Sequence, residues 1–130
     1  MENEIGNLIR LFIWRIPKKN HDTMMQLNKP AKDLFRKVGV RQEVFQPSNI
    51  KDKEAENMGF TNVAKTVTAR EDEEVWLELQ FYEDSKHHDE ISEKMRNDKS
   101  AMELGKKFME IITPGSCVEG RFNHYRLLSI

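Results

Sequence analysis

The sequence predicts one α+β domain of the ferredoxin-like type, in which helices cover one face of an antiparallel sheet. Its predicted elements follow the order strand, helix, strand, hairpin, helix, strand, which is the split βαβ pattern with one extra strand. The chain has 130 residues, the size of one ordinary domain, and no repeat or low-complexity segment divides it. We therefore expect a single domain over residues 1–130, with residues 1–5 disordered.

The first part of the chain is predicted to form two strands separated by a helix. Residues 6–16 are rich in Ile, Leu, Phe and Trp and stop at a proline, which is typical of a strand. In residues 18–38 apolar side chains recur every three or four positions, which predicts a helix. Pro30 should kink this helix or begin a second short one, and Gly39 is expected to end it. Residues 40–46 form the second predicted strand.

A hairpin is the central feature predicted for the second part of the chain. The polar residues 50–62 are expected to form a loop. Residues 63–69 alternate Val with Thr and Ala, and residues 75–81 alternate large apolar with polar groups, so both read as strands joined by a charged turn. The remaining predicted elements are a helix over residues 85–96 capped by Asp84 or Ser85, a helix over residues 100–112, and a last strand over residues 118–128.

Aromatic side chains are expected on the open face of this sheet. In strands, alternate residues share a face, so Phe12 lies with Trp14, and Trp76 lies with Tyr82. A single helical layer covers only one face, and a large exposed apolar patch usually marks a partner surface. The simplest partner is a second copy of the chain, packed sheet against sheet, so we expect a homodimer.

Composition and charge exclude several classes of function. The 21 basic and 22 acidic residues nearly cancel, which disfavours nucleic acid as a partner. The longest apolar run, residues 11–14, is far too short to span a bilayer, so no membrane partner is expected. The single cysteine, Cys117, cannot form an intrachain disulfide and is read as structural or incidental. A cytoplasmic location is expected, because that compartment keeps thiols reduced.

Several short stretches resemble a known family. These stretches are Leu8–Pro17 followed by a helix, residues 34–40, the hairpin strand at residues 74–78, residues 94–98 after the second helix, and Gly120-Arg121-Phe122. They are similar to stretches of the YbaA-like family of uncharacterised conserved proteins. That family belongs to the dimeric α/β-barrel superfamily. The resemblance implies a dimer with a cavity between sheet and helices, and it implies no known activity.

The sequence has no motif of a cofactor or metal site. A phosphate-binding loop, a dinucleotide fingerprint, a Gly-x-Ser-x-Gly elbow and a Cys-x-x-Cys pair are all missing, so no cofactor is expected. The four histidines lack ligand spacing, and no metal is expected. His87 and His88 follow two acidic residues, which is more typical of a solvated helix start than of a metal site or a general base.

A small-molecule site is the remaining hypothesis, and we expect it on the open sheet face. The catalytic candidates are His124 and Tyr125, which point to opposite faces of the last strand, and Glu78. Whether the chain is an enzyme stays open. The alternatives are a small-molecule enzyme, a non-catalytic ligand-binding or stress-response dimer and, least favoured, a nucleic-acid binder. The candidate pocket residues are Arg10, Phe12, Trp14, Trp76, Gln80 and Tyr82.

Overall fold

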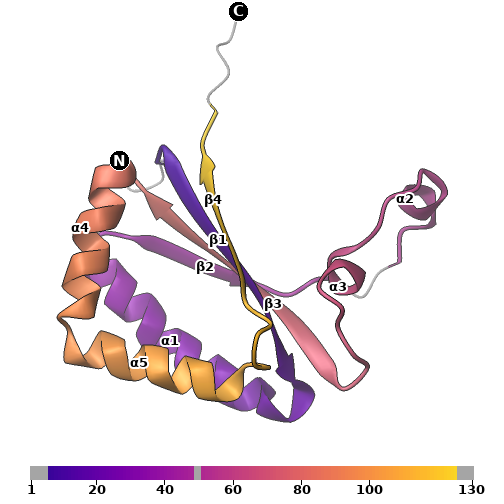
Figure 1. Cartoon of the computed structure of the whole chain (residues 1–130), viewed down its shortest axis with the longest axis horizontal. Helices are drawn as coiled ribbons and strands as arrows, with labels where there is room; N and C mark the ends of the chain where they lie inside the picture. The colour runs from indigo at the N-terminus through magenta and orange to yellow at the C-terminus, as the bar shows by residue number, and fades with distance from the viewer. Residues whose placement is uncertain (1–5, 49–50, 126–130) are drawn as a thin grey trace, which may run out of the picture.

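A four-stranded antiparallel sheet with helices on one side forms the body of the protein (Figure 1). The computed structural model describes residues 6–48 and 51–125. The strand order is β2-β3-β1-β4, which is the ferredoxin-like arrangement, so the predicted fold class is confirmed. The strands are β1 (Leu8–Pro17), β2 (Arg41–Phe45), β3 (Glu73–Tyr82) and β4 (Val118–Asn123), and the helices are η1 (Lys18–Asn20), α1 (His21–Lys37), α2 (Lys53–Asn57), α3 (Val63–Thr66), α4 (Ser85–Arg96) and α5 (Lys99–Ile111).

The two central strands carry most of the sheet. β1 lies between β3 and β4, and β2 and β4 form the edges. β1 and β3 pair along their full length, from Leu8 opposite Tyr82 to Pro17 opposite Glu73. This register determines which side chains meet between the sheet and the helices.

Several helices begin or end at residues that favour helix termini. Gly39 follows α1 with a φ of 78°, a conformation that glycine adopts without strain. The Asp84 carboxylate accepts a hydrogen bond from the His87 amide at 2.8 Å and so caps α4. Pro30 lies inside α1, which continues as one helix, so the alternative of a second short helix there is wrong.

The predicted hairpin strand at residues 63–69 is wrong. Val63–Thr66 forms the short helix α3, because the Asn62 side chain accepts a hydrogen bond from the Lys65 amide at 2.9 Å. The predicted loop at residues 50–62 contains a second short helix, α2. β2 therefore pairs directly with β3, and α2 and α3, which lie between these strands in the chain, are away from the main helical layer (Figure 1).

The aromatic residues expected on the open face lie against the helices instead. Trp14 is 1% exposed, and its ring meets the Phe108 ring of α5 edge-on at 4.9 Å. Trp76 belongs to the same core cluster, and Tyr82 packs with Ile91 of α4. Phe12 packs against this core as well. Strand periodicity shows which residues share a face, but not which face the helices cover.

The open face of the sheet carries the opposite set of side chains, which is apolar on the two central strands and includes Arg41 and Glu43 on β2. The register places Ile13 beside Leu77 and Leu11 beside Leu79 across β1 and β3. Residues paired across antiparallel strands project to the same face, so the pattern extends onto both edge strands. We define the open face by its apolar members, which are Ile9, Leu11, Ile13, Phe45, Leu77, Leu79, Phe81, Val118 and Phe122.

Candidate functional site

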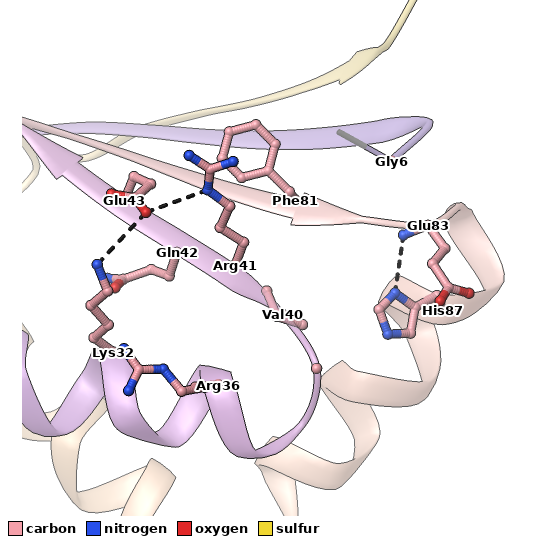
Figure 2. A pocket seen from close by; sticks show the side chains of 11 residues that line it. Gly6, Lys32, Arg36, Val40, Arg41, Gln42, Glu43, Phe81, Glu83 and His87 are labelled. Carbon is pink, nitrogen blue, oxygen red and sulfur yellow. Dashed lines mark hydrogen bonds and ion pairs between the residues drawn. The ribbon is translucent and has the colours of Figure 1, made fainter. Parts of the chain in front are cut away.

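A groove of about 680 Å³ lies at the outer edge of β2 (Figure 2). Its charged groups are largely paired with one another. The Glu43 carboxylate lies 3.6 Å from Lys32 Nζ and 3.4 Å from Arg41 Nε, and His87 Nδ1 accepts a hydrogen bond from the Glu83 amide at 3.1 Å. Paired charges on exposed side chains describe a surface groove along a free sheet edge, so we place the candidate site elsewhere.

A second pocket, of about 480 Å³, lies between the sheet and α4. Side chains from β1, β3 and β4 form its floor, and α4 with one residue of α1 forms its wall. The apolar part of the lining is Phe35, Ile91 and Met95. The polar part is Arg10, Gln80, Tyr82, His88, Asp89, Ser92, Arg96 and Arg121.

Strand register builds the polar floor of this pocket. Gln80 on β3 is paired with Gln42 on β2 and with Arg10 on β1, and Arg10 is paired with Arg121 on β4. These four side chains therefore form one row across the helix-facing side of the sheet. α4 covers the row with His88, which is only 2% exposed.

Arg10 and His88 form the contact that joins floor and wall. Arg10 NH1 lies 3.3 Å from His88 Nε2. A guanidinium has no acceptor, so Nε2 must accept, and the proton of a neutral imidazole then lies on Nδ1. Nδ1 is 3.2 Å from the Asp89 carboxylate, which accepts that proton's hydrogen bond. The geometry assigns a neutral imidazole with one defined tautomer.

The rest of the Arg10 guanidinium lacks a matched carboxylate. Its Nε is buried without a hydrogen bond and lies 3.5 Å from Glu119 Oε1. The same Glu119 oxygen accepts a hydrogen bond from Arg121 Nε at 3.2 Å. The Arg10 guanidinium carbon lies 4.6 Å from the centre of the Phe12 ring. Arg10 is thus held in place by an imidazole, a ring and one shared carboxylate oxygen, and not by both oxygens of one carboxylate, which its planar fork suits.

A chain of hydrogen bonds fixes the amide of Gln80. The Tyr82 hydroxyl donates to Gln80 Oε1 at 2.6 Å, Gln80 Nε2 donates to Glu78 Oε2, and Gln42 Nε2 donates to Glu78 Oε1 at 2.9 Å. Burial raises the pKa of Glu78 although both amides and Arg10 favour its charged form. Burial also raises the pKa of Tyr82 to about 12, against the pull of Arg10, so its phenol stays a donor.

The structure brings together only some of the residues that the sequence suggested. Arg10, Gln80 and Tyr82 line the pocket, and Glu78 lies behind Gln80. Phe12 supports Arg10. The remaining two pocket candidates, Trp14 and Trp76, lie in the core cluster.

His124 and Tyr125 lie past the end of β4 and do not line this pocket. The His124 amide donates to the Asn7 carbonyl at 2.8 Å, and its Nδ1 is buried without a hydrogen bond. Tyr125 is 83% exposed. The rest of the predicted last strand, residues 126–128, lies outside the described residues, as do residues 1–5.

Sequence reasoning missed His88. His87 fits the expectation of a solvated helix start, and its ring accepts a hydrogen bond from the Glu83 amide. His88, in contrast, is buried. The signal that finds it is spacing, because His88, Ile91 and Met95 recur at three and four positions and so share one stripe of α4. A histidine inside an apolar stripe marks a buried polar contact, and here that contact is Arg10.

Other kinds of site lack support in the part of the chain that the structure describes. Residues 6–48 and 51–125 contain no cluster of three or more His, Cys, Asp or Glu side chains able to hold a metal ion. Within the same ranges no helix has the length and apolar character needed to cross a membrane. Burial raises the pKa of the Cys117 thiol, which keeps it protonated and weakly nucleophilic.

Comparison with known proteins identifies a family. A search of curated proteins found no match. One family model matches residues 7–111, which covers β1 through α5 and includes most of the pocket lining. The YbaA-like resemblance and its dimeric α/β-barrel superfamily remain predictions. The chain belongs to the family described as "Protein of unknown function (DUF1428)", for which no activity is assigned.

Proposed function

We propose that the protein binds a small molecule in the pocket between the sheet and α4. Its volume of about 480 Å³ suits a small ligand, since ligand sites in proteins span roughly 300–1,000 Å³. The apolar wall of Phe35, Ile91 and Met95 faces a floor of converging polar groups. This combination of an apolar wall and a few oriented polar groups is what holds a small ligand in one pose.

The observation that supports binding most strongly is that the polar floor of the pocket lowers the stability of the fold. Burying charged groups lowers stability unless they are well paired, and apolar residues of similar size usually stabilise a fold better. Arg10 nevertheless lies beneath α4 and contacts a neutral imidazole, and its Nε has no hydrogen bond. A ligand that completes these contacts gives the arrangement a physical reason.

Binding without catalysis suits this geometry better than an enzymatic reaction. The acceptor nitrogen of His88 is already occupied by Arg10, and Glu78 is held by two amides behind the pocket floor. The Tyr82 phenol, with its pKa raised to about 12, is a poor base. The groups in and behind the floor that could act as a base are thus engaged in other contacts.

We also propose that two copies associate through the open face, in the cytoplasm. Its apolar residues extend over all four strands and lie opposite the covered side of the sheet. A twofold axis brings such a patch against itself, so one surface serves both copies. The homodimer is thus proposed with Leu11 and Leu79 at its centre, in place of the tryptophans that the sequence suggested.

Nuclear magnetic resonance with a library of small organic fragments, both charged and neutral, tests the pocket. We expect bound fragments to shift backbone amides of α4 and of the facing parts of β1 and β3. Ser92→Leu fills the pocket from α4 and should abolish these shifts, whereas Ser92→Ala removes only the hydroxyl and should retain them. Fragments that shift other regions, or that bind Ser92→Leu unchanged, would show that the pocket is not the site.

Sedimentation velocity tests the dimer. We expect the native chain to sediment as a dimer at micromolar concentration and Leu79→Arg to sediment as a folded monomer, because a charge on the open face cannot be buried without a partner. Met102→Arg places the same charge on an exposed position of α5 and should leave the dimer intact. A native chain that is monomeric at this concentration would refute the dimer.

A further inference from the structure

We infer that the ligand of this pocket is a small organic carboxylate with an apolar body. The inference rests on the proposed function and adds the charge and shape of the ligand. It draws on the distribution of charge around the pocket, on the contacts that the guanidinium groups make, and on the polar groups that are already engaged elsewhere.

Positive charge exceeds negative charge in the lining. Arg10, Arg121 and Arg96 come from three different elements, and Asp89 is the one carboxylate among the lining residues. Asp89 is directed at His88 Nδ1, 3.2 Å away, and not at a guanidinium. An anion that enters the pocket therefore meets several cations and few competing charges.

Two of these arginines share a single carboxylate oxygen. Glu119 Oε1 is 3.2 Å from Arg121 Nε and 3.5 Å from Arg10 Nε. A guanidinium has five N–H donors in a planar fork, and it is best satisfied by two oxygens of one carboxylate. The floor of the pocket thus has donors for a second carboxylate, which a ligand can supply.

His88 Nε2 now accepts the Arg10 hydrogen bond that an oxygen of the ligand would accept. Arg10 NH1 donates to a neutral imidazole, and hydrogen bonds between charged partners are roughly twice as strong as those with a neutral acceptor. A carboxylate can therefore replace Nε2 as the acceptor of Arg10. The released Nε2 then has another donor at hand, because the Ser92 hydroxyl lies 3.5 Å away. After the exchange, both Arg10 NH1 and His88 Nε2 have a partner.

The neutral polar groups of the floor are less able to bind a ligand. Both ends of the Gln80 amide are used, one by the Tyr82 hydroxyl and the other by Glu78. A neutral amide ligand of the same shape lacks the negative charge that pairs with Arg10 and Arg121. The apolar body of the ligand packs against Phe35, Ile91 and Met95.

Isothermal titration with benzoate and benzamide tests the inference, because these probes share a shape and differ in charge. We expect benzoate to bind about tenfold more tightly or better, the ratio that a charged hydrogen bond of roughly 1.5–3 kcal/mol implies. Arg10→Gln should remove this preference, and Arg10→Lys, which keeps the charge and loses the fork, should retain part of it. Arg36→Gln, in the groove of Figure 2, should leave it unchanged.

The outcomes separate this inference from the proposed function. Equal binding of benzoate and benzamide, both lost in Ser92→Leu, overturns the inference and leaves the pocket as a binding site. Tighter binding of phenyl phosphate than of benzoate overturns the carboxylate in favour of a phosphate. Absence of binding by benzoate and by a series of aliphatic carboxylates also overturns it. If Arg10→Gln does not fold, Arg121→Gln on the edge strand serves in its place, with the same loss of preference expected.

Discussion

Arg10 on β1 donates a hydrogen bond to His88 on α4, and the two atoms lie 3.3 Å apart although 78 positions separate the residues. The contact joins the floor and the wall of the pocket, and His88 is buried there. It also fixes the imidazole as a neutral acceptor, since a guanidinium can only donate. The stability of this pair and the chemistry of the pocket are therefore linked.

Replacing His88 with Ala should lower the free energy of unfolding by about 1–3 kcal/mol, because a largely buried Arg10 loses its acceptor. Urea denaturation of the purified protein measures the change. His87→Ala is the matched control. Its ring accepts a hydrogen bond from the Glu83 amide at the exposed start of α4, so its loss should cost less. Equal losses in the two variants would contradict the role of the Arg10 contact.

Glu73→Gln should destabilise the protein in a pH-dependent way. Burial alone would raise the pKa of Glu73, but hydrogen bonds from Thr113, the Arg70 amide and Arg15 lower it to about 2, from an ordinary value of 4.5. A lowered pKa means that the carboxylate stabilises the fold above pH 4.5 and that this contribution is lost as the pH falls toward 2.

The variant should therefore be about 2–4 kcal/mol less stable than the native chain at neutral pH, the range expected for breaking a buried charged contact. The difference should shrink steadily in acid, as followed by chemical denaturation at a series of pH values. Glu71→Gln removes a charge from the neighbouring turn without touching Arg15 and should show little effect. A constant difference at all pH values would argue against the lowered pKa.

Glu78 should give the stability of the fold the opposite dependence on pH. Its pKa is raised by burial above the ordinary 4.5, so its contribution to stability is complete below that pH and is lost as the pH rises through the folded-state pKa. In Glu78→Gln this decline should disappear, and the change is visible in the same denaturation series. Glu90→Gln on the exposed side of α4 controls for net charge. If stability still declines with rising pH in Glu78→Gln, another group causes the decline.

Thr68→Gly should stabilise the protein by about 1 kcal/mol. Thr68 has a φ of 58°, which is a left-handed conformation. This conformation costs a β-branched residue roughly 1–2 kcal/mol, whereas glycine adopts it freely. The larger conformational entropy of glycine in the unfolded state offsets part of the gain. Thr66→Gly, at the last position of α3, should have the opposite sign. Thermal unfolding compares them, and destabilisation by Thr68→Gly would mean that contacts of the threonine side chain outweigh its backbone strain.

Much of the fold follows from the sequence because its signals are local. Alternation of side chains in residues 75–81 predicts β3, and apolar spacing predicts α1 with Gly39 at its end. The strand predicted at residues 63–69 failed for an equally local reason. The Asn62 cap begins a helix there, and a run of Val, Thr and Ala does not exclude one.

By itself, the sequence determined the order of the main strands and helices, apart from residues 50–69, and which side chains share a face of each strand. Only the tertiary structure decided which face the helices cover, because period-two alternation is the same whichever face becomes the core. That decision moved Trp14 into the core, placed Leu11 and Leu79 on the open face, and brought His88 onto Arg10. The pocket arises from strand register and helix docking, and contacts between residues so far apart in the chain leave no local pattern to read.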